Sequence, residues 1–392
     1  MSMISNAMSG LNAANVAMTV AGQNVANAAV DGYSRQAASF ATSNSPLGGV
    51  YVNSVDRIVD AFLNDDIWRT QSDLSYYQSK QTYLGYVEEI VGTDSLNFND
   101  AVGQITNAFN AAASSPDSNA YRQQIISSSE GLIQDLAQMN GALSAQIDKL
   151  SLEMTNLASN TSSTAQQIAD VNQSIVQAIA NKQPTAELKD KREQLITELS
   201  SQIGIAITER DDGSLDISTL SGAPLVIGTS AATVSVAGTE VSTSLKGQSF
   251  TLNDQVGGKF GGLISADSQV IQPTLEKLSD LVKDFADDVN TALSEGFDLN
   301  GDAGIPLFTY NVANPLSSIE INPAITPEKI ALIGGSLTQE EIGLQQAGVA
   351  IMPMSPILLR QFKVMMMISL YWLGIWELQV NKIKTVRQPL KC

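Results

Sequence analysis

The side chains of this chain that could do chemistry are mostly carboxylates, and their sharpest arrangement is an alternating acidic loop. Asp298, Asn300 and Asp302 have the spacing at which calcium-binding loops place their oxygen ligands. Such a loop needs Gly at its sixth position and a bidentate Glu at its twelfth, where this sequence has Ala303 and Thr309. The spacing therefore favours a structural turn, built on the local preferences of Asp, Asn and Gly, over a calcium site.

Other arrangements that could support catalysis are weaker. Acidic pairs at residues 65–66, 211–212 and 287–288 could act as acid and base, but adjacent residues on a helix point apart. The glycines between residues 257 and 262 match neither the dinucleotide-binding nor the Walker spacing. The chain has no His, and its one Cys, Cys392, cannot form an internal disulfide. We predict a protein that is not an enzyme and holds no cofactor or metal; a wall hydrolase on a structural scaffold is the enzymatic alternative.

The overall charge of the chain narrows the choice of partners. Its 392 residues include 22 basic and 40 acidic ones, which gives a net charge of −18. Such a balance argues against nucleic acid as a partner. Residues 1–30 contain no basic residue and no continuous apolar core, so we expect no cleaved secretory signal. The length allows two or three domains.

A long heptad repeat dominates the elements that would position these side chains. It runs over residues 126–178 with one seam, which predicts a long coiled-coil-like helix or two helices in register. We expect a bend or a loop at its polar run, residues 160–164. Further helices are predicted at residues 55–91, 98–112, 188–199 and 271–292. The buried positions expected in the first of these are Ile58, Phe62, Ile67, Leu74, Tyr77, Leu84 and Val87.

Short β-type runs separated by glycines lie between residues 205 and 252 and predict a small antiparallel sheet. The runs are residues 205–208, 215–218, 225–227, 233–236 and 249–252. Residues 37–53 should form a loop that ends in a short strand at 50–52. The predicted fold is therefore mainly α with a small β insert, an α+β multidomain arrangement in which the chain leaves a helical bundle and returns to it.

The N-terminal residues carry a narrower apolar stripe, at steps of three and four, which is the a/d seam of a coiled coil. Every d position of this stripe is Ala, which lets a partner backbone approach closely. So thin a seam buries little area alone, and this indicates assembly rather than catalysis. We expect residues 4–25 to be disordered or loosely packed in the isolated chain. The predicted assembly interface consists of Ile4, Ala7, Leu11, Ala14, Met18, Ala21 and Val25.

A motif follows the stripe directly: Asn-Val-Ala-Asn at residues 24–27, then Gly-Tyr-Ser-Arg-Gln at residues 32–36. It resembles the N-terminal signature of the axial proteins of the bacterial flagellum, and its ending looks most like hook-associated proteins of the FlgK type. That family often has Thr-Pro before the Gly-Tyr, where this chain has Val30-Asp31. An Asp-Gly turn would still end the helix. The signature positions are Asn24, Ala26, Asn27, Gly32, Tyr33 and Arg35.

Four further segments resemble the same family in the same order, so that the resemblance covers roughly residues 1–333. They are Ser114-Ser115-Pro116 with Arg122, residues 190–195, residues 296–304 with 307–308, and Asn322-Pro323-Ala324 with residues 329–331.

The resemblance implies a structural subunit that joins hook to filament in the extracellular flagellum and leaves the cell by type III export. It implies the hook protein and the next hook-associated protein as partners, self-association in a ring, and an export chaperone. The alternative is a secreted adhesin or translocon-tip-like protein built on similar coiled coils, with a hydrophobic tail that contacts a membrane. The expected domains are residues 1–36 (axial helix and turn), 37–203 (helical bundle), 204–265 (β domain), 266–350 (return to the bundle) and 351–392 (tail).

The tail differs in composition from the rest of the chain. Residues 351–392 hold six Lys or Arg and one Glu, a net charge of +5, together with Trp372 and Trp376. Its uncharged stretch, residues 364–376, is too short to span a membrane, which takes about 20 residues. We expect the tail to be out of register with the ancestral coding frame. The stripe would then lack the second heptad helix with which it pairs in this family, and the chaperone site would be in question.

Overall fold

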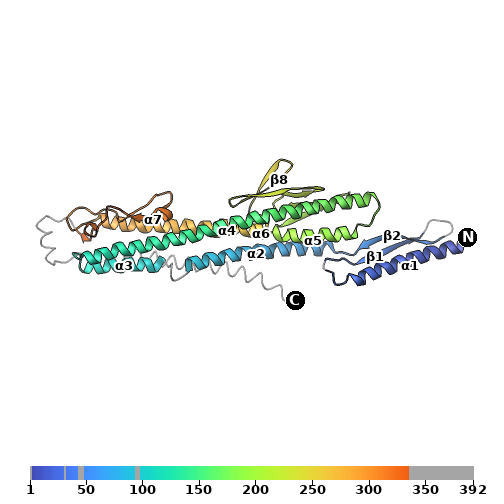
Figure 1. Ribbon diagram of the computed structural model, residues 1–392, viewed down its shortest axis with the longest axis horizontal. Helices are drawn as coiled ribbons and strands as arrows, with labels where there is room; N and C mark the ends of the chain where they lie inside the picture. Colours follow the sequence, from blue (N-terminus) through green and yellow to red (C-terminus); the bar gives the residue numbers. More distant parts are fainter. Residues whose placement is uncertain (1, 31, 43–47, 93–97, 335–392) are drawn as a thin grey trace. The chain divides into compact units, whose positions relative to one another are not determined.

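The computed structural model describes residues 2–30, 32–42, 48–92 and 98–334 (Figure 1). Contacts within the chain divide it into two compact units, Met1–Thr82 with Asp148–Asp267 and Tyr83–Ile147 with Ser268–Cys392. Two helices, α2 (Ala61–Gly92) and α4 (Asn119–Ala180), contribute residues to both units. The predicted fold class is confirmed, because most described residues are helical and the strands form small antiparallel sheets.

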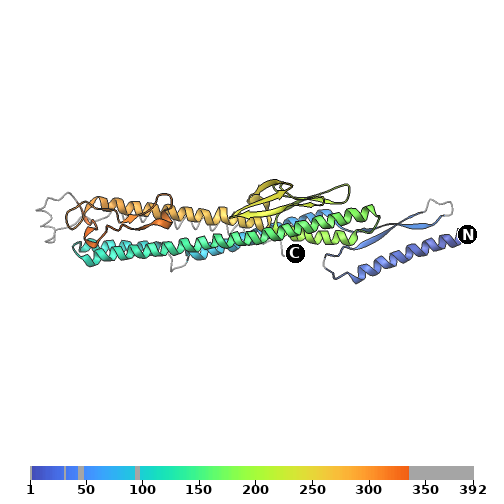
Figure 2. The same cartoon turned by 45° about the horizontal axis from the view of Figure 1, so that its top comes forward.

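The first unit begins with a helix that packs on a β-hairpin, and we refer to residues 2–57 as the N-terminal arm. Helix α1 (Ser2–Ala26) lies alongside strands β1 (Gln36–Thr42) and β2 (Val50–Arg57), which pair antiparallel with a bulge at Ser39/Phe40 (Figures 1 and 2). The short strand predicted at residues 50–52 lies within β2 and is confirmed, whereas the predicted loop is wrong at residues 37–42, which form β1. Alternate small side chains of β1, such as Ala38, turn toward the arm's interior, so a run that reads as polar and flexible pairs as a strand.

Helix α2 starts later than predicted. Strand β2 continues to Arg57, and the Asp60 carboxylate then accepts hydrogen bonds from the backbone N–H groups of Phe62 (3.0 Å) and Leu63 (3.3 Å). This is an N-cap, which fixes the first helical turn at Ala61 rather than at residue 55.

The buried positions predicted for this helix are correct only in its second half. Val87 is buried, and Leu74, Tyr77 and Leu84 are half-buried. Ile58, Phe62 and Ile67 are exposed instead. The helical spacing does not hold across the end of β2 and the first turns of α2, where none of the described residues covers these apolar side chains.

The central heptad repeat forms one continuous helix, α4, after helix α3 (Phe98–Ser114) and before helix α5 (Ala186–Gln202). The expected bend or loop at residues 160–164 is wrong. Thr161 and Thr164 are buried in the seam, and Ser162 accepts a hydrogen bond from the backbone N–H of Val234 (2.8 Å). The polar run is thus used to hold neighbouring elements and does not break the helix.

The β insert contains two antiparallel sheets rather than the single one predicted. One is four-stranded and the other three-stranded. Strands β6 and β8 were not predicted, because β6 has two residues and β8 reads as polar. The first sheet is formed by β3 (Ile205–Glu209), β4 (Leu215–Thr219), β5 (Pro224–Ile227) and β6 (Ser230–Ala231), and the second by β7 (Thr233–Ala237), β8 (Glu240–Leu245) and β9 (Gln248–Leu252).

The glycines at residues 257–262 serve close packing. A 3₁₀ turn, η2 (Asp254–Val256), leads to helix α6 (Gly258–Ala266). A Cβ atom on Gly262 would lie 2.4 Å from the backbone oxygen of Tyr76 in α2. Only a residue without a side chain lets these two helices approach so closely.

In the second unit, helix α7 (Gln272–Ser294) forms where a helix was predicted and buries one apolar face. A π-helical turn, η3 (Asp267–Ile271), precedes the helix. Leu278, Val282, Phe285 and Val289 are buried, and the Phe285 ring lies 6.1 Å from that of Phe98 and 5.8 Å from that of Phe308. Short elements complete the unit: β10 (Gly296–Phe297) with β13 (Ile333–Gly334), β11 (Phe308–Thr309) with β12 (Glu320–Ile321), α8 (Pro315–Ser318) and η4 (Pro327–Lys329).

Two segments singled out in the sequence meet in this unit through Arg122. Its side chain is fully buried, and it donates to the backbone oxygens of Pro116 (2.6 Å), Pro327 (3.3 Å) and Ile330. Burial lowers the pKa of Arg122 from its ordinary value. Within the described ranges, no helix is long and apolar enough to cross a bilayer. The predicted tail, residues 351–392, lies outside the described residues.

Candidate assembly interface

All seven positions of the predicted stripe on α1 are exposed. Ile4 and Val25, at its two ends, expose 74% and 78% of their surface, and Leu11 and Met18 between them expose 55% and 65%. The alanines of the stripe, Ala7, Ala14 and Ala21, are exposed as well. The structure therefore brings these residues together on one open helix face.

A different face of α1 packs against the β1–β2 hairpin of the N-terminal arm. Ala13 and Val20 are buried against the hairpin, and the backbone N–H of Val50 donates to Ser9 Oγ (3.2 Å). The expectation of a disordered or loosely packed segment at residues 4–25 is wrong. The hairpin that replaces the expected loop gives α1 a docking partner within the chain.

Signature residues join the end of α1 to the start of β1. The Asn24 side chain donates to the backbone oxygen of Gln36 (2.9 Å) and accepts from its N–H (2.9 Å), so the amide imitates a strand partner. The Tyr33 hydroxyl also donates to Asn24 Oδ1 (2.9 Å). These contacts explain why Asn and Tyr occur at this spacing, since each satisfies backbone or side-chain groups that the turn would leave open.

Of the remaining signature residues, Gly32 and Asn27 make close contacts, whereas the side chains of Ala26 and Arg35 do not. Gly32 has φ +78°, and a Cβ there would lie 2.1 Å from Nε2 of Gln194 in α5. Asn27 donates to the backbone oxygen of Gln23 within α1 (3.0 Å). The side chains of Ala26 and Arg35 are exposed and do not join this cluster. Asp31 lies outside the described residues.

Arg57, the last residue of β2, is a further residue of this site that the sequence motifs do not indicate. Its guanidinium lies 2.7 Å from Asp190 Oδ1 and 2.5 Å from Glu193 Oε2, both in α5. Asp190 and Glu193 were noted only as parts of a family-like segment. The residues before it include Asn53, Ser54 and Asp56, so no apolar pattern in the sequence marks this arginine as a buried residue.

Exposed apolar side chains are concentrated near the N-terminus. Most of the large hydrophobic residues that the described structure leaves exposed lie between Ile4 and Ile67. Ile58, Val59, Phe62, Leu63 and Ile67 form a second group, around the start of α2. Soluble monomers rarely leave such groups open, so their concentration marks an interaction surface.

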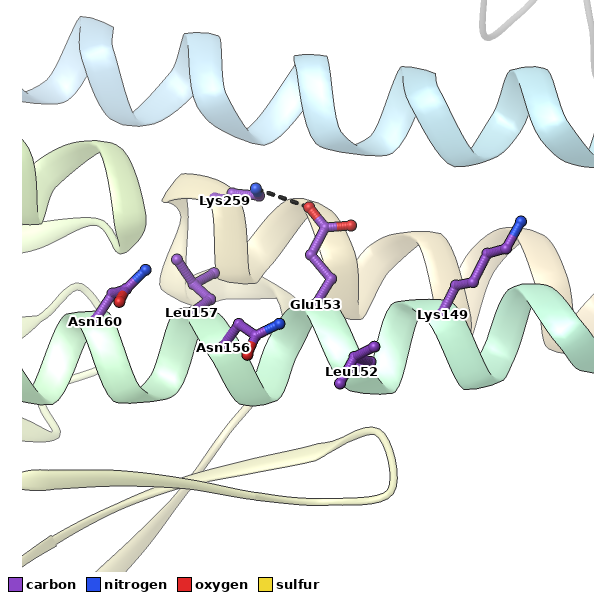
Figure 3. A pocket seen from close by; sticks show the side chains of 7 residues that line it. All are labelled: Lys149, Leu152, Glu153, Asn156, Leu157, Asn160 and Lys259. Atoms are coloured by element: carbon purple, nitrogen blue, oxygen red, sulfur yellow. Dashed lines mark ion pairs between the residues drawn. The ribbon is translucent and has the colours of Figure 1, made fainter.

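A shallow groove on the first unit is lined mostly by polar and charged side chains, unlike the exposed apolar groups described above (Figure 3). It lies between α4 and α6, and its volume is about 270 Å³. Lys259 forms an ion pair with Glu153 (2.7 Å) at its edge. The groove is lined by Lys149, Leu152, Glu153, Asn156, Leu157, Asn160 and Lys259, a set that does not place an acid and a base against a common reacting atom.

The acidic loop forms the expected structural turn. Asp298 Oδ1 accepts hydrogen bonds from the backbone N–H groups of Asn300 (2.7 Å) and Asp302 (2.9 Å), so the carboxylate is engaged by its own loop. Across the described ranges, no group of three or more His, Cys, Asp or Glu side chains could hold a metal ion.

The acidic pairs are likewise occupied in local contacts. Asp66 pairs with Arg69 (2.5 Å). Hydrogen bonds from the Ser214 hydroxyl and backbone lower the pKa of Asp212. Burial alone would raise the pKa of Asp287, but hydrogen bonds from Tyr310 and Lys283 lower it. One carboxylate of each pair is therefore engaged by a neighbouring side chain or backbone group.

Long packed helices, a small β insert and an open coiled-coil face define a structural protein of the assembling kind. A family described as "Flagellar hook-associated protein FlgK helical domain" matches residues 84–308, more than half of the chain. The chain belongs to the FlgK family of flagellar hook-associated proteins. The resemblance inferred from the sequence motifs is thereby confirmed.

Relatives in other bacteria carry the name flagellar hook-associated protein 1. That of Escherichia coli K12 is 29% identical over 330 residues, which cover 78% of this chain and 60% of the relative. That of Salmonella typhimurium LT2 is 26% identical over 329 residues, covering 79% and 59%. The chain thus spans about 60% of the length of these relatives. The match to the Bacillus subtilis protein is shorter, at 25% identity over 227 residues, 54% of this chain and 45% of the relative.

A solved structure shares the fold. It is described as the flagellar hook junction protein FlgK from Burkholderia pseudomallei, and it matches with a TM-score of 0.58 at 22% identity. The match covers 63% of this chain and 47% of that structure.

Proposed function

We propose that this chain is a structural subunit of the bacterial flagellum, placed where the hook meets the filament and needed for filament assembly. One observation carries the proposal: a chain of the FlgK family presents seven stripe positions of α1 on an open face. The subunit would act by filling a position in the assembly, not by catalysis.

The α1 face would pair with helices of neighbouring subunits. Burial of Ile4, Leu11, Met18 and Val25 removes apolar area from water, which is the main driving force for such association. The alanines between them allow close backbone approach, as in tightly packed coiled coils. The hairpin behind α1 supplies a rigid backing, so the face is presented as a preformed surface.

The proposed partners follow from the family. They are the hook protein on one side, the next hook-associated protein on the other, further copies of this chain in a ring, and an export chaperone before secretion. The proposed location is extracellular, at the hook–filament junction. The α1 stripe would form the inner tube, the helices within residues 55–199 and 271–292 the middle shell, and the β insert the outer surface.

Complementation tests the proposal. A strain that lacks its own hook-associated protein 1 should make filaments when it expresses this chain if the tail, residues 351–392, is competent, and should shed flagellin into the medium if the tail is out of frame. A Leu11→Asp, Met18→Asp variant should instead shed flagellin into the medium, because two charges on the stripe would have to be desolvated in the assembly. Leu152→Asp is the matched control, since Leu152 is 63% exposed on α4, outside the stripe. Filaments from the double variant would contradict the proposal, as would their absence from the parent chain when its tail is shown to be in frame.

A further inference from the structure

The contact between the N-terminal arm and α5 is built around one cation. Arg57 ends β2, and its side chain is only 7% exposed although it carries a full charge. Asp190 Oδ1 lies 2.7 Å away, Glu193 Oε2 2.5 Å and Ser34 Oγ 2.8 Å. Two carboxylates from one helix and a hydroxyl from the signature turn thus surround the guanidinium.

Both charge and hydrogen bonds hold this cluster together, since Arg57 donates to Glu193 and Ser34 and forms an ion pair with Asp190. Arg57 Nε and Asp190 Oδ1 are both buried without an aligned hydrogen bond among the described residues. Asp190 is 11% exposed and Glu193 27%, so solvent screens the pair less than it screens a surface ion pair. Removal of the guanidinium would leave two carboxylates facing a gap, a costly arrangement.

A second contact fixes the angle at which the arm meets α5. Gly32 leaves no room for a Cβ against Gln194, and the backbone N–H of Ser34 points to Asp190 Oδ2 (3.4 Å). The backbone N–H of Ile58 donates to the Arg35 oxygen (2.8 Å) and closes the neck of the arm. Contacts at two points of one rigid helix define an orientation, whereas a single contact would only tether the arm.

We propose that Arg57 is a positioning residue that latches the N-terminal arm onto α5 and so sets the direction in which the α1 stripe is presented. The latch rests on contacts within the free chain. Only its consequence for assembly rests on the proposed function. Loss of the Arg57 charge would release the arm from its fixed orientation while α1, β1 and β2 remain packed on one another.

A distance measurement between the arm and the bundle tests the latch. The full chain with Cys392→Ser would carry nitroxide labels at Asn15→Cys on α1 and Gln173→Cys on α4, both exposed positions of the first unit. We expect one narrow distance distribution for this labelled parent. Arg57→Met, which keeps the length of the stem and removes the charge, should broaden it at least twofold.

Further variants separate a latch from a packing role. Arg69→Ala removes an exposed arginine that also pairs with an aspartate, so it is the matched control and should leave the distribution narrow. Asp190→Asn with Glu193→Gln should broaden the distribution without touching the arm, and Arg57→Lys should restore part of the narrowness. A narrow distribution in both Arg57→Met and the double amide variant, or a broad one in the parent, would overturn the latch. Failed complementation by the parent would bear only on the proposed function.

Discussion

Helices α1 and α7 have the same spacing of apolar residues, but those residues are exposed on α1 and buried on α7. In α7 the stripe is buried, with Phe285 set between the rings of Phe98 and Phe308. In α1 the stripe is open, and a flanking face with Ala13 and Val20 holds the helix to the hairpin. Apolar periodicity therefore predicts a packing partner for a helix. It does not show whether that partner belongs to the same chain.

Side-chain size separates the two cases. The α7 stripe is made of Leu, Val and Phe, which can fill a core, whereas the α1 stripe alternates large residues with Ala. A narrow stripe suits a helix of equal length on another subunit, because both backbones can approach along the seam. The two helices should consequently respond differently to the same kinds of substitution.

The largest difference should come from truncation of an apolar side chain. Phe285→Ala in α7 should lower the free energy of unfolding by about 3–5 kcal/mol, because it empties a buried aromatic cluster. Leu11→Ala in α1 should change it by less than about 0.5 kcal/mol, since Leu11 is exposed in the free chain. Chemical denaturation of both variants measures the contrast; equal losses would mean that α1 is packed in the monomer.

A smaller difference should appear at glycines inside helices. Gly262→Ala should destabilise the first unit by about 1–3 kcal/mol, because a Cβ would meet the Tyr76 backbone oxygen at 2.4 Å. Gly22→Ala in α1 should stabilise its helix by about 0.5–1 kcal/mol, since that site has nothing within 4 Å and Ala is the better helix former. Amide exchange of the two helices would show both effects. Slower assembly by Gly22→Ala despite a firmer helix would indicate that a partner backbone approaches there.

The smallest difference concerns pH. The lowered pKa of Asp287 means that its contacts with Tyr310 and Lys283 stabilise the folded state above the carboxyl's unfolded pKa, about 3.9, and that this contribution is lost as pH falls through the lower folded pKa. Tyr310→Phe should therefore lower the melting temperature at pH 7 and less so near pH 2. Helix α1 has no charged residue, so amide exchange within it, corrected for intrinsic rates, should not follow this change. If the difference in melting temperature between Tyr310→Phe and the parent chain is the same near pH 2 as at pH 7, the stabilising role given to Asp287 is contradicted.

Patterns over long stretches allowed most of the fold to be predicted. The seam of α4 and the stripe of α7 lie where the heptad spacing puts them, because side chains that must share one face leave a clear period. The hairpin could not be recognised, since β1 contains Ala and Ser and pairs only because α1 covers it. The polar run at residues 160–164 stays helical because contacts from distant strands use its hydroxyl groups.

The candidate site was predictable in part. The stripe and the signature residues Asn24, Gly32 and Tyr33 could be identified from spacing and resemblance. Arg57 could not, because its role depends on carboxylates more than 130 residues away in the chain, which no local pattern reports. The face of α1 that binds the hairpin was missed for the same reason, since its partner had been predicted as a loop.

Methionine oxidation tests the central claim most directly, since this chain has exposed methionines on α1 and buried methionines on α4. Met8 and Met18 in α1 are 52% and 65% exposed, whereas Met139 and Met154 in α4 are buried. In the free chain, peroxide should oxidise Met18 at least tenfold faster than Met154. In the assembled flagellum, the rate at Met18 should fall by a similar factor. Slow oxidation of Met18 in the free chain, or an unchanged rate after assembly, would contradict an α1 stripe that is open in the subunit and buried in the flagellum.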